Sequence, residues 1–77
     1  MDVSKAFGKA IKLRRIEVDL TQEALADKAR MSRSFVSGIE RGEKQATVPS
    51  VYKLAEALDT QPSRLWQQAE TLMASKS

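Results

Sequence analysis

This chain lacks the two residue types on which most catalytic and metal sites depend. None of its 77 residues is cysteine or histidine. Without cysteine there are no disulfides and no thiolate ligands, and without histidine the commonest general base and metal ligand is missing. The sequence also has no glycine-rich phosphate loop and no carboxylates at metal-ligand spacing. We therefore expect no enzyme activity, no metal site and no cofactor.

Long apolar runs are absent as well. No stretch approaches the roughly 20 residues that a membrane-spanning helix needs. Residues 1–5 lack the apolar region of a secretion signal. We therefore expect a cytoplasmic protein with no membrane partner. A chain of 77 residues is expected to form one domain with a small core.

Charge is unevenly distributed along the chain. The net charge is +3, from 13 basic and 10 acidic residues. Residues 1–52 hold 10 basic and 7 acidic residues, which leaves 3 of each sign for residues 53–77. The excess of basic charge therefore lies in the first two-thirds of the chain. A basic surface favours phosphate backbones, although an ordinary solvated surface gives the same composition.

Apolar residues recur at helical spacing throughout the chain, and no segment has the pattern of a strand. The sequence therefore predicts an all-α fold. The expected helices span about 3–18, 21–29, 33–41, 48–58 and 62–74. Suitable caps precede four of them, with Asp2 or Ser4 before the first and Thr21, Ser32 and Thr47 before the next three. Pro62 opens the fifth, and residues 74–77 are expected to fray.

Only Arg30 and Met31 separate the second and third predicted helices. Two helices joined by so short a turn cross at a steep angle, as in a helix-turn-helix. The third helix presents small and basic side chains on its outer face, which suits a helix that lies against DNA. Its Gly38 costs up to about 1 kcal/mol of helix stability relative to Ala. A close approach of DNA and a tight helix–helix contact both explain that glycine, and both remain open.

An ordered set of motifs runs from Phe7 to Trp66. The pieces are Phe7-Gly8, Ile11 and Arg15, then Leu20-Thr21-Gln22-Glu23 with Leu25-Ala26, then Ser32-Arg33-Ser34, Val36-Ser37, Ile39-Glu40-Arg41-Gly42, and finally Leu54-Ala55 with Leu58 and Leu65. With these spacings the chain resembles the lambda-repressor-like, Cro/C1-type (XRE) helix-turn-helix family. Residues 32–42 are also similar to the recognition segment of restriction–modification controller proteins. Small phage repressors and antitoxin-type regulators share much of it.

The resemblance implies a compact five-helix bundle that binds double-stranded DNA in a sequence-specific manner and regulates transcription. It implies base-reading roles for Arg33, Ser34 and Ser37, and phosphate contacts for Gln22, Arg41 and Lys44. The physical chemistry agrees, since arginine can donate two hydrogen bonds to guanine and a helix N-terminus attracts phosphate. A phosphate contact or a solvated charge remains the alternative for Arg33.

The resemblance further implies a structural ion pair between Arg15 and Glu40. Family members commonly dimerise through their last helices, so Trp66, Ala69, Leu72 and Met73 are expected at a homodimer interface, unless all four simply pack inside the protomer. Operator or promoter DNA is the expected partner, with RNA polymerase a further candidate and no small-molecule ligand. Control of its own promoter is an extension by analogy. The alternative function is a protein-interaction or bridging module on the same fold.

Overall fold

The computed structural model of the chain describes residues 1–75, in which there are five helices and no strand. The helices are α1 (Val3–Glu17), α2 (Gln22–Ala29), α3 (Arg33–Glu40), α4 (Val48–Ala57) and α5 (Pro62–Ala74). The predicted ends of the first, third and fourth helices each differ by one residue, within the usual uncertainty of a helix boundary. The fraying expected at residues 76 and 77 lies outside the described residues.

Side-chain caps determine where α1 to α4 begin. In each case the residue before the helix accepts a hydrogen bond from the backbone N–H three residues later, and these residues are Asp2, Thr21, Ser32 and Thr47. Such a cap satisfies one of the free donors of the first turn. Asp2 rather than Ser4 caps α1, at 2.8 Å from its donor. The start of α5 has no side-chain cap and is set by Pro62 instead.

One hydrophobic cluster joins all five helices. Its largest fully buried side chains are Ile11, Leu25, Val36, Ile39, Leu54 and Leu58. Among residues 1–75 the core contains no buried polar or charged residue. The core is therefore mainly aliphatic, and Phe7 is its one buried aromatic residue among residues 1–75.

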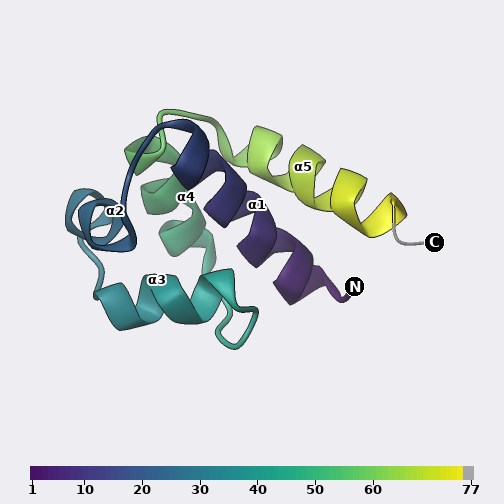
Figure 1. Cartoon of the computed structure of the whole chain (residues 1–77), viewed down its shortest axis with the longest axis horizontal. Helices are drawn as coiled ribbons and strands as arrows, with labels where there is room; N and C mark the ends of the chain where they lie inside the picture. The colour runs from purple at the N-terminus through teal and green to yellow at the C-terminus, as the bar shows by residue number, and fades with distance from the viewer. Residues whose placement is uncertain (76–77) are drawn as a thin grey trace.

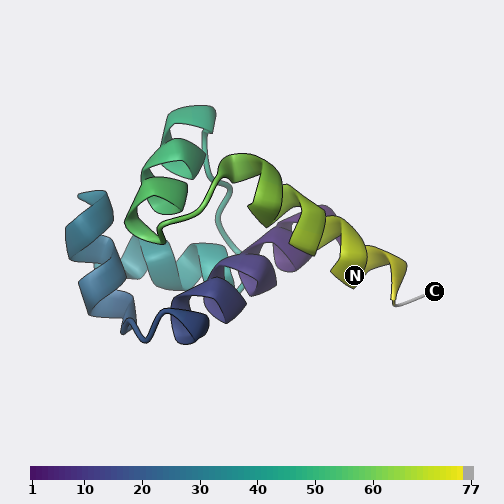
Figure 2. The same ribbon diagram turned by 90° about the horizontal axis from the view of Figure 1, so that it is seen from above.

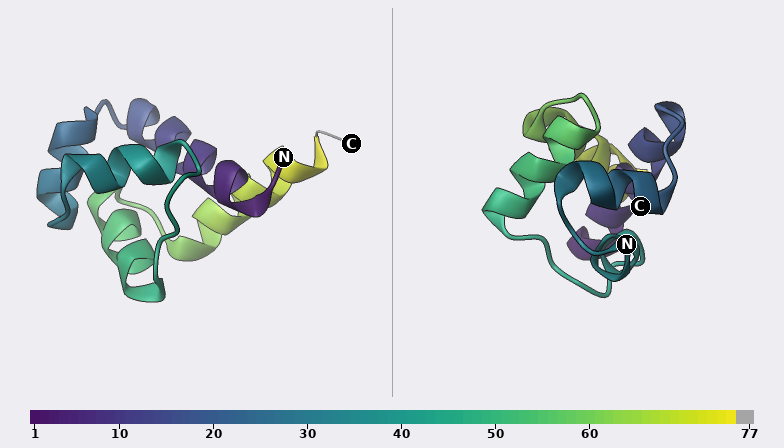
Figure 3. Two further views of the ribbon diagram at one scale, coloured as in Figure 1. Left: turned by 90° about the horizontal axis from the view of Figure 1, so that it is seen from below. Right: turned by 90° about the vertical axis from the view of Figure 1, so that its left-hand side faces the viewer.

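The helices leave α3 on one side of the molecule. α1 packs against both α3 and α5, and α2 packs against α3 and α4. α3 lies along the lower edge in Figure 1 and α5 along the upper edge, with α1 between them. In the view from above, α3 lies behind the other helices (Figure 2), and from below it crosses the front of the molecule (Figure 3, left). The outer face of α3 is thus free to meet a large partner.

Three connections between helices use a left-handed residue that is not glycine. Asp19 (φ 62°), Arg30 (φ 58°) and Asp59 (φ 55°) follow α1, α2 and α4. Aspartate tolerates this conformation better than most residues. An arginine at this position carries no local signal for it, so the conformation of Arg30 depends on the structure around it. Beyond α4, the guanidinium of Arg14 donates to the carbonyls of Leu58 (3.0 Å) and Asp59 (2.9 Å) and so closes the end of that helix.

α1 and α3 cross in contact at Gly8. A Cβ at this position would overlap the carbonyl oxygen of Ile39 and lie 2.8 Å from that of Glu40. Only a glycine lets the two backbones approach this closely. The crossing sets the distance between the exposed α3 and the rest of the bundle.

Candidate nucleic-acid interface

The first turn of α3 is the part of the helix most open to a partner. Arg33 and Ser34 are exposed, and neither side chain hydrogen-bonds to another of residues 1–75. All five N–H donors of the Arg33 guanidinium are therefore free for an external acceptor. Guanine O6 and N7 in the major groove match that fork, and so do phosphate oxygens. The structure thus places both residues where a base-reading role requires them.

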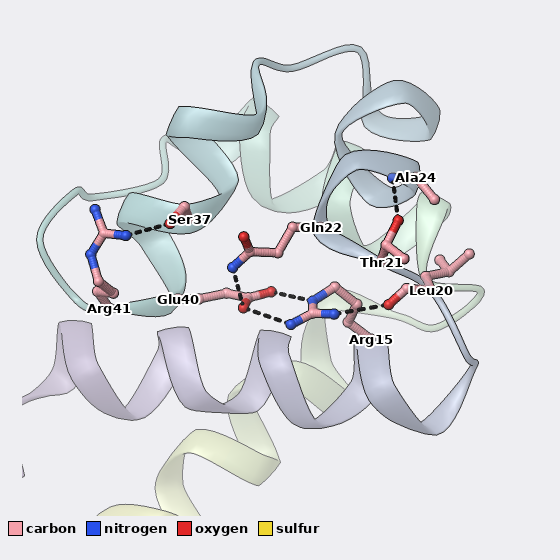
Figure 4. Close-up of polar contacts among 8 residues, drawn as sticks. All are labelled: Arg15, Leu20, Thr21, Gln22, Ala24, Ser37, Glu40 and Arg41. Atoms are coloured by element: carbon pink, nitrogen blue, oxygen red, sulfur yellow. Dashed lines mark hydrogen bonds and ion pairs between the residues drawn. The ribbon is translucent and has the colours of Figure 1, made fainter.

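The opposite end of α3 is tied to two other helices through one carboxylate. Arg15 of α1 donates from Nε to Glu40 Oε2 (2.6 Å) and from Nη2 to Glu40 Oε1 (3.1 Å). Its Nη1 donates to the carbonyl of Leu20, at 2.9 Å, just before α2 (Figure 4). The structure therefore brings Arg15 and Glu40 together in the two-pronged geometry that gives the strongest charge-assisted hydrogen bonds.

This ion pair is largely shielded from solvent. The side chains of Arg15 and Glu40 are 12% and 3% exposed. No buried side-chain nitrogen or oxygen within residues 1–75 lacks a hydrogen-bond partner. A buried pair whose partners are all satisfied holds its elements in one arrangement, and breaking it leaves an unpaired charge. The orientation of α3 relative to α1 and α2 is thus fixed from its C-terminal end.

Gln22, the residue expected to contact phosphate, also belongs to this network. Its Nε2 donates to Glu40 Oε1 at 3.0 Å (Figure 4). An amide nitrogen has two donors, so one N–H remains for a ligand beside the free N–H groups of the first turn of α2. Sequence reasoning missed the contact with Glu40, because it depends on how α2 is placed against α3.

Ser37 and Arg41 form a second polar cluster on the outer side of α3. Arg41 Nη1 donates to the Ser37 hydroxyl, and Arg41 Nη2 lies 3.0 Å from Glu43 Oε1 (Figure 4 shows the first contact). The hydrogen bond from Arg41, and then its charge, lower the pKa of the Glu43 carboxyl. The same contacts raise the pKa of Arg41. Two residues expected at DNA are therefore engaged with each other in the free protein.

The exposed apolar residues lie on a different side of the molecule. Trp66 of α5 is 43% exposed and rests on Phe7, with the ring centroids 5.0 Å apart and the planes at 37°. Met73, seven residues further along the same helix, is 38% exposed. Both are available to a second protomer, as a dimer contact requires. Leu72 is only partly buried and packs against the core.

The expectation for Ala69 was wrong. Ala69 is 0% exposed and belongs to the core of the protomer. The reason is periodicity, since Leu65, Ala69 and Leu72 recur at i, i+4 and i+7 and form the inner stripe of α5. Trp66 and Met73 lie beside that stripe and not on it.

Two exposed residues of α4 extend the same kind of surface. Val48 and Tyr52 are 74% and 64% exposed. A separate hollow of about 270 Å³ is lined by Val3, Phe7, Lys44, Val51 and Trp66 among others. Nothing in the sequence singles out Val48 or Tyr52, because both fall off the inner stripe of α4 and so look like ordinary surface residues.

No cluster of metal-ligating residues and no membrane-spanning helix accompanies these features in the described part of the chain. Residues 1–75 contain no group of three or more acidic residues placed to hold a metal ion. None of the five helices is long and apolar enough to cross a membrane.

In a comparison with known protein families, residues 11–65 match the helix-turn-helix family model. A HTH-type transcriptional regulator of Sinorhizobium fredii, y4dJ, is 38% identical over 58 residues, which cover 75% of this chain and 75% of that protein. The crystal structure of the restriction-modification controller protein C.AhdI from Aeromonas hydrophila is 38% identical, with a TM-score of 0.78 over 79% of this chain and 92% of that one. The clp gene regulator ClgR from Corynebacterium glutamicum has a TM-score of 0.96 at 25% identity, covering 99% of this chain and 81% of that one.

Proposed function

Because the chain belongs to the helix-turn-helix family of DNA-binding transcriptional regulators, we propose that it acts as a homodimer that places the first turn of α3 in the major groove of an operator. The observation that carries this proposal is the division of α3 into two halves. Its start holds Arg33 and Ser34 free of internal contacts, whereas its end is fixed to α1 and α2 through Glu40. A reading residue needs both freedom to reach a base and a rigid support.

In this proposal the basic side chains have separate tasks. Arg33 donates two hydrogen bonds to a guanine, which contributes about 1–3 kcal/mol of discrimination. Ser34 and Ser37 are short and add less specific contacts. Gln22, Arg41 and Lys44 bind phosphates on either side and set the register of α3 in the groove. Since a single long side chain reads bases in each half-site, DNA shape and a second protomer supply the remaining specificity.

The dimer uses Trp66 and Met73 of α5, with Val48 and Tyr52 of α4 as an extension of the same face. Residues 1–77 then form one DNA-binding domain whose last helix, about 62–74, also joins two copies. A two-fold dimer of this kind binds half-sites about 34 Å apart along the duplex. The operator is therefore expected to be a near-palindrome.

The site of action follows from the relatives. One is a controller protein of a restriction–modification system, and we extend to this chain a role in controlling the promoter of its own operon. RNA polymerase is then the protein that a promoter-bound dimer meets, in the cytoplasm. The proposed role requires no catalysis, no cofactor and no small-molecule ligand.

Selection of bound sequences from random duplex DNA tests the proposal. The wild-type chain should enrich a two-fold symmetric motif containing guanine in each half. The same selection with Arg33→Ala should lose the preference for that guanine while other positions persist. An unchanged motif would show that Arg33 does not read a base.

Salt dependence separates DNA binding from the alternative of a protein-bridging module. Affinity for the selected duplex should fall steeply between about 50 and 200 mM salt, because each phosphate contact releases counterions. Gln22→Ala should weaken all duplexes by a similar factor, since a phosphate contact carries no sequence information. If no duplex is enriched and no salt-dependent binding is found, the DNA-binding role is wrong.

A further inference from the structure

Gly38 occupies the middle of α3 at a position where a helix does not favour glycine. It is buried although α3 lies at the edge of the molecule. Glycine inside a helix loses more conformational entropy on folding than alanine does. Something therefore offsets that cost, and the two explanations left open by the sequence were a close helix–helix contact and a close approach of DNA.

The neighbour of Gly38 is a single side chain. A Cβ at Gly38 would lie 2.6 Å from Cγ of Lys44, 3.0 Å from Cδ and 3.3 Å from Cε. Three successive carbons of the Lys44 side chain thus lie along the space that a side chain at Gly38 would occupy. At Gly8, by contrast, the nearest atoms belong to the backbone of α3. A helix–helix contact explains Gly8 but not Gly38.

The backbone holds Lys44 at the same place. The N–H groups of Glu43 and Lys44 both donate to the carbonyl oxygen of Gly38, at 2.9 and 3.2 Å. The residues after α3 therefore fold back over its last turn. The Lys44 side chain starts from a fixed point and lies across the residue to which its own backbone is bound.

This arrangement prepares the charge of Lys44 for a ligand. A lysine stem is flexible, and ordering it on binding costs conformational entropy that is avoided when the stem is already in place. None of the three ion pairs among residues 1–75 includes Lys44. Arg41, by comparison, already donates to Ser37 and Glu43 in the free protein.

We propose that Gly38 is a positioning residue for DNA binding: its missing side chain leaves the space in which the Lys44 stem lies along α3, so that the ammonium group is held ready for a phosphate. The inference rests on the proposed DNA-binding function and adds a residue that acts without contacting DNA itself.

The proposal predicts opposite effects of Gly38→Ala on folding and on binding. The added methyl group meets the flexible stem of an exposed lysine, which can move aside, so the fold survives. Alanine also favours the helix. The melting temperature should therefore stay the same or rise, while affinity for DNA falls because the Lys44 stem is displaced. A residue with a merely structural role would change both in the same direction.

A double-mutant cycle on the duplex selected by the wild-type chain measures the coupling. Lys44→Met keeps the aliphatic stem and removes the charge, and should lower affinity about fivefold and reduce the salt slope by about one. Gly38→Ala should lower affinity about threefold to fivefold in the wild-type background, and by less than about 1.5-fold in the K44M background.

The outcomes separate this inference from the proposed function. If G38A lowers affinity equally in both backgrounds, Gly38 acts on DNA directly and the inference is overturned. It is also overturned if G38A binds like the wild-type protein or lowers the melting temperature in step with affinity. Failure of the wild-type chain to bind any duplex would instead overturn the DNA-binding proposal.

Discussion

At the scale of single residues, the carboxylate of Glu40 links α3 to both α1 and α2. It accepts two hydrogen bonds from Arg15 and one from Gln22, and its side chain is only 3% exposed. Arg41 and Glu43 form a pair of similar length on the surface, with both side chains more than half exposed. The two pairs allow a buried and an exposed interaction to be compared within one helix and its following turn.

We expect Glu40→Ala to destabilise the protein strongly. The change leaves the Arg15 guanidinium largely buried without its partner, which costs about 3 kcal/mol. In a chain of this size that lowers the melting temperature by at least about 10 °C. Thermal unfolding followed by circular dichroism measures the effect.

The matched control is Glu43→Ala, which breaks the exposed pair and should shift the melting temperature by no more than a few degrees. If E40A melts together with the control, Glu40 does not brace α3.

In the proposed DNA complex, Glu43 competes with phosphate for Arg41. We expect Glu43→Gln to raise affinity for the selected duplex by about twofold to fivefold, because the guanidinium no longer has to leave a carboxylate. Fluorescence anisotropy with a labelled duplex measures the change. Asp59→Asn, in the connection between α4 and α5, removes the same charge away from α3 and from the proposed dimer face, and should leave affinity unchanged.

The advantage of E43Q should persist from about pH 6 to pH 8. Arg41 lowers the pKa of Glu43, so the carboxylate stays ionised across that range. Any stabilisation from the pair is fully present above the pKa that Glu43 has in the unfolded chain. It is lost as the pH falls through the lower pKa that Glu43 has in the folded protein. An advantage of E43Q that vanished at pH 6 would contradict this competition.

At the scale of helices, the contact between α1 and α3 depends on one missing side chain. We expect Gly8→Ala to lower the free energy of unfolding by about 1–3 kcal/mol, because the new methyl group meets the backbone carbonyls of α3, which cannot move aside. Helix propensity acts in the opposite direction by up to about 1 kcal/mol and does not cancel the clash. Urea unfolding measures the net change in the free energy of unfolding. Gly38→Ala is the control, because Gly38 should tolerate the same substitution. Equal stability of the two variants would show that α1 and α3 do not need this close approach.

Helix boundaries followed from local chemistry and were therefore predictable. Thr21, Ser32 and Thr47 each cap the helix that the sequence assigned to them. The features that escaped sequence reasoning all depend on tertiary placement. Arg30 takes a left-handed conformation, and Arg14 of α1 donates hydrogen bonds that close the end of α4.

The candidate site divides in the same way. Arg33 and Ser34 are exposed because a helix-turn-helix exposes the start of its second helix, which a motif reveals. The engagement of Ser37 with Arg41 and of Gln22 with Glu40 depends on rotamers and on the packing of neighbouring helices. The prediction that Ala69 lies at the dimer interface was wrong because it grouped Ala69 with Trp66 and Met73. Ala69 instead lies on the inner stripe of α5 and packs in the core.

At the scale of the whole molecule, the accessible surface of 5015 Å² limits what can be shared between DNA and a second protomer. A stable interface needs about 800 Å² from each partner, which is about one-sixth of that surface. α3 is assigned to DNA in our proposal, and α5 lies on the other side of α1 (Figure 1). The exposed side chains of Trp66, Met73 and Tyr52 are therefore available to a partner copy while α3 is bound.

We expect Met73→Asp to convert the proposed homodimer into a monomer at micromolar concentration. Two copies of the carboxylate near the two-fold axis would be desolvated together, which weakens association at least about tenfold. Sedimentation velocity gives the oligomeric state, and affinity for a two-fold operator should fall in parallel.

Leu13→Asp is the control for this variant, since Leu13 is an exposed apolar residue beside a separate groove between α1 and α5. Dissociation by L13D and not by M73D would place the interface in that groove.

The eight residues of α3 place the two functions of the helix about 10 Å apart, at a rise of 1.5 Å per residue. Residues 33 and 34 are at one end, and Glu40 is at the other. In our proposal, substitutions at residues 33 and 34 therefore change which bases are contacted without touching any group that maintains the fold. A lineage carrying this scaffold can thus acquire a new operator through one or two exposed substitutions and remain folded at every step. The same independence makes these two positions suitable for a randomised library in which each member is expected to fold and only the recognised DNA sequence varies.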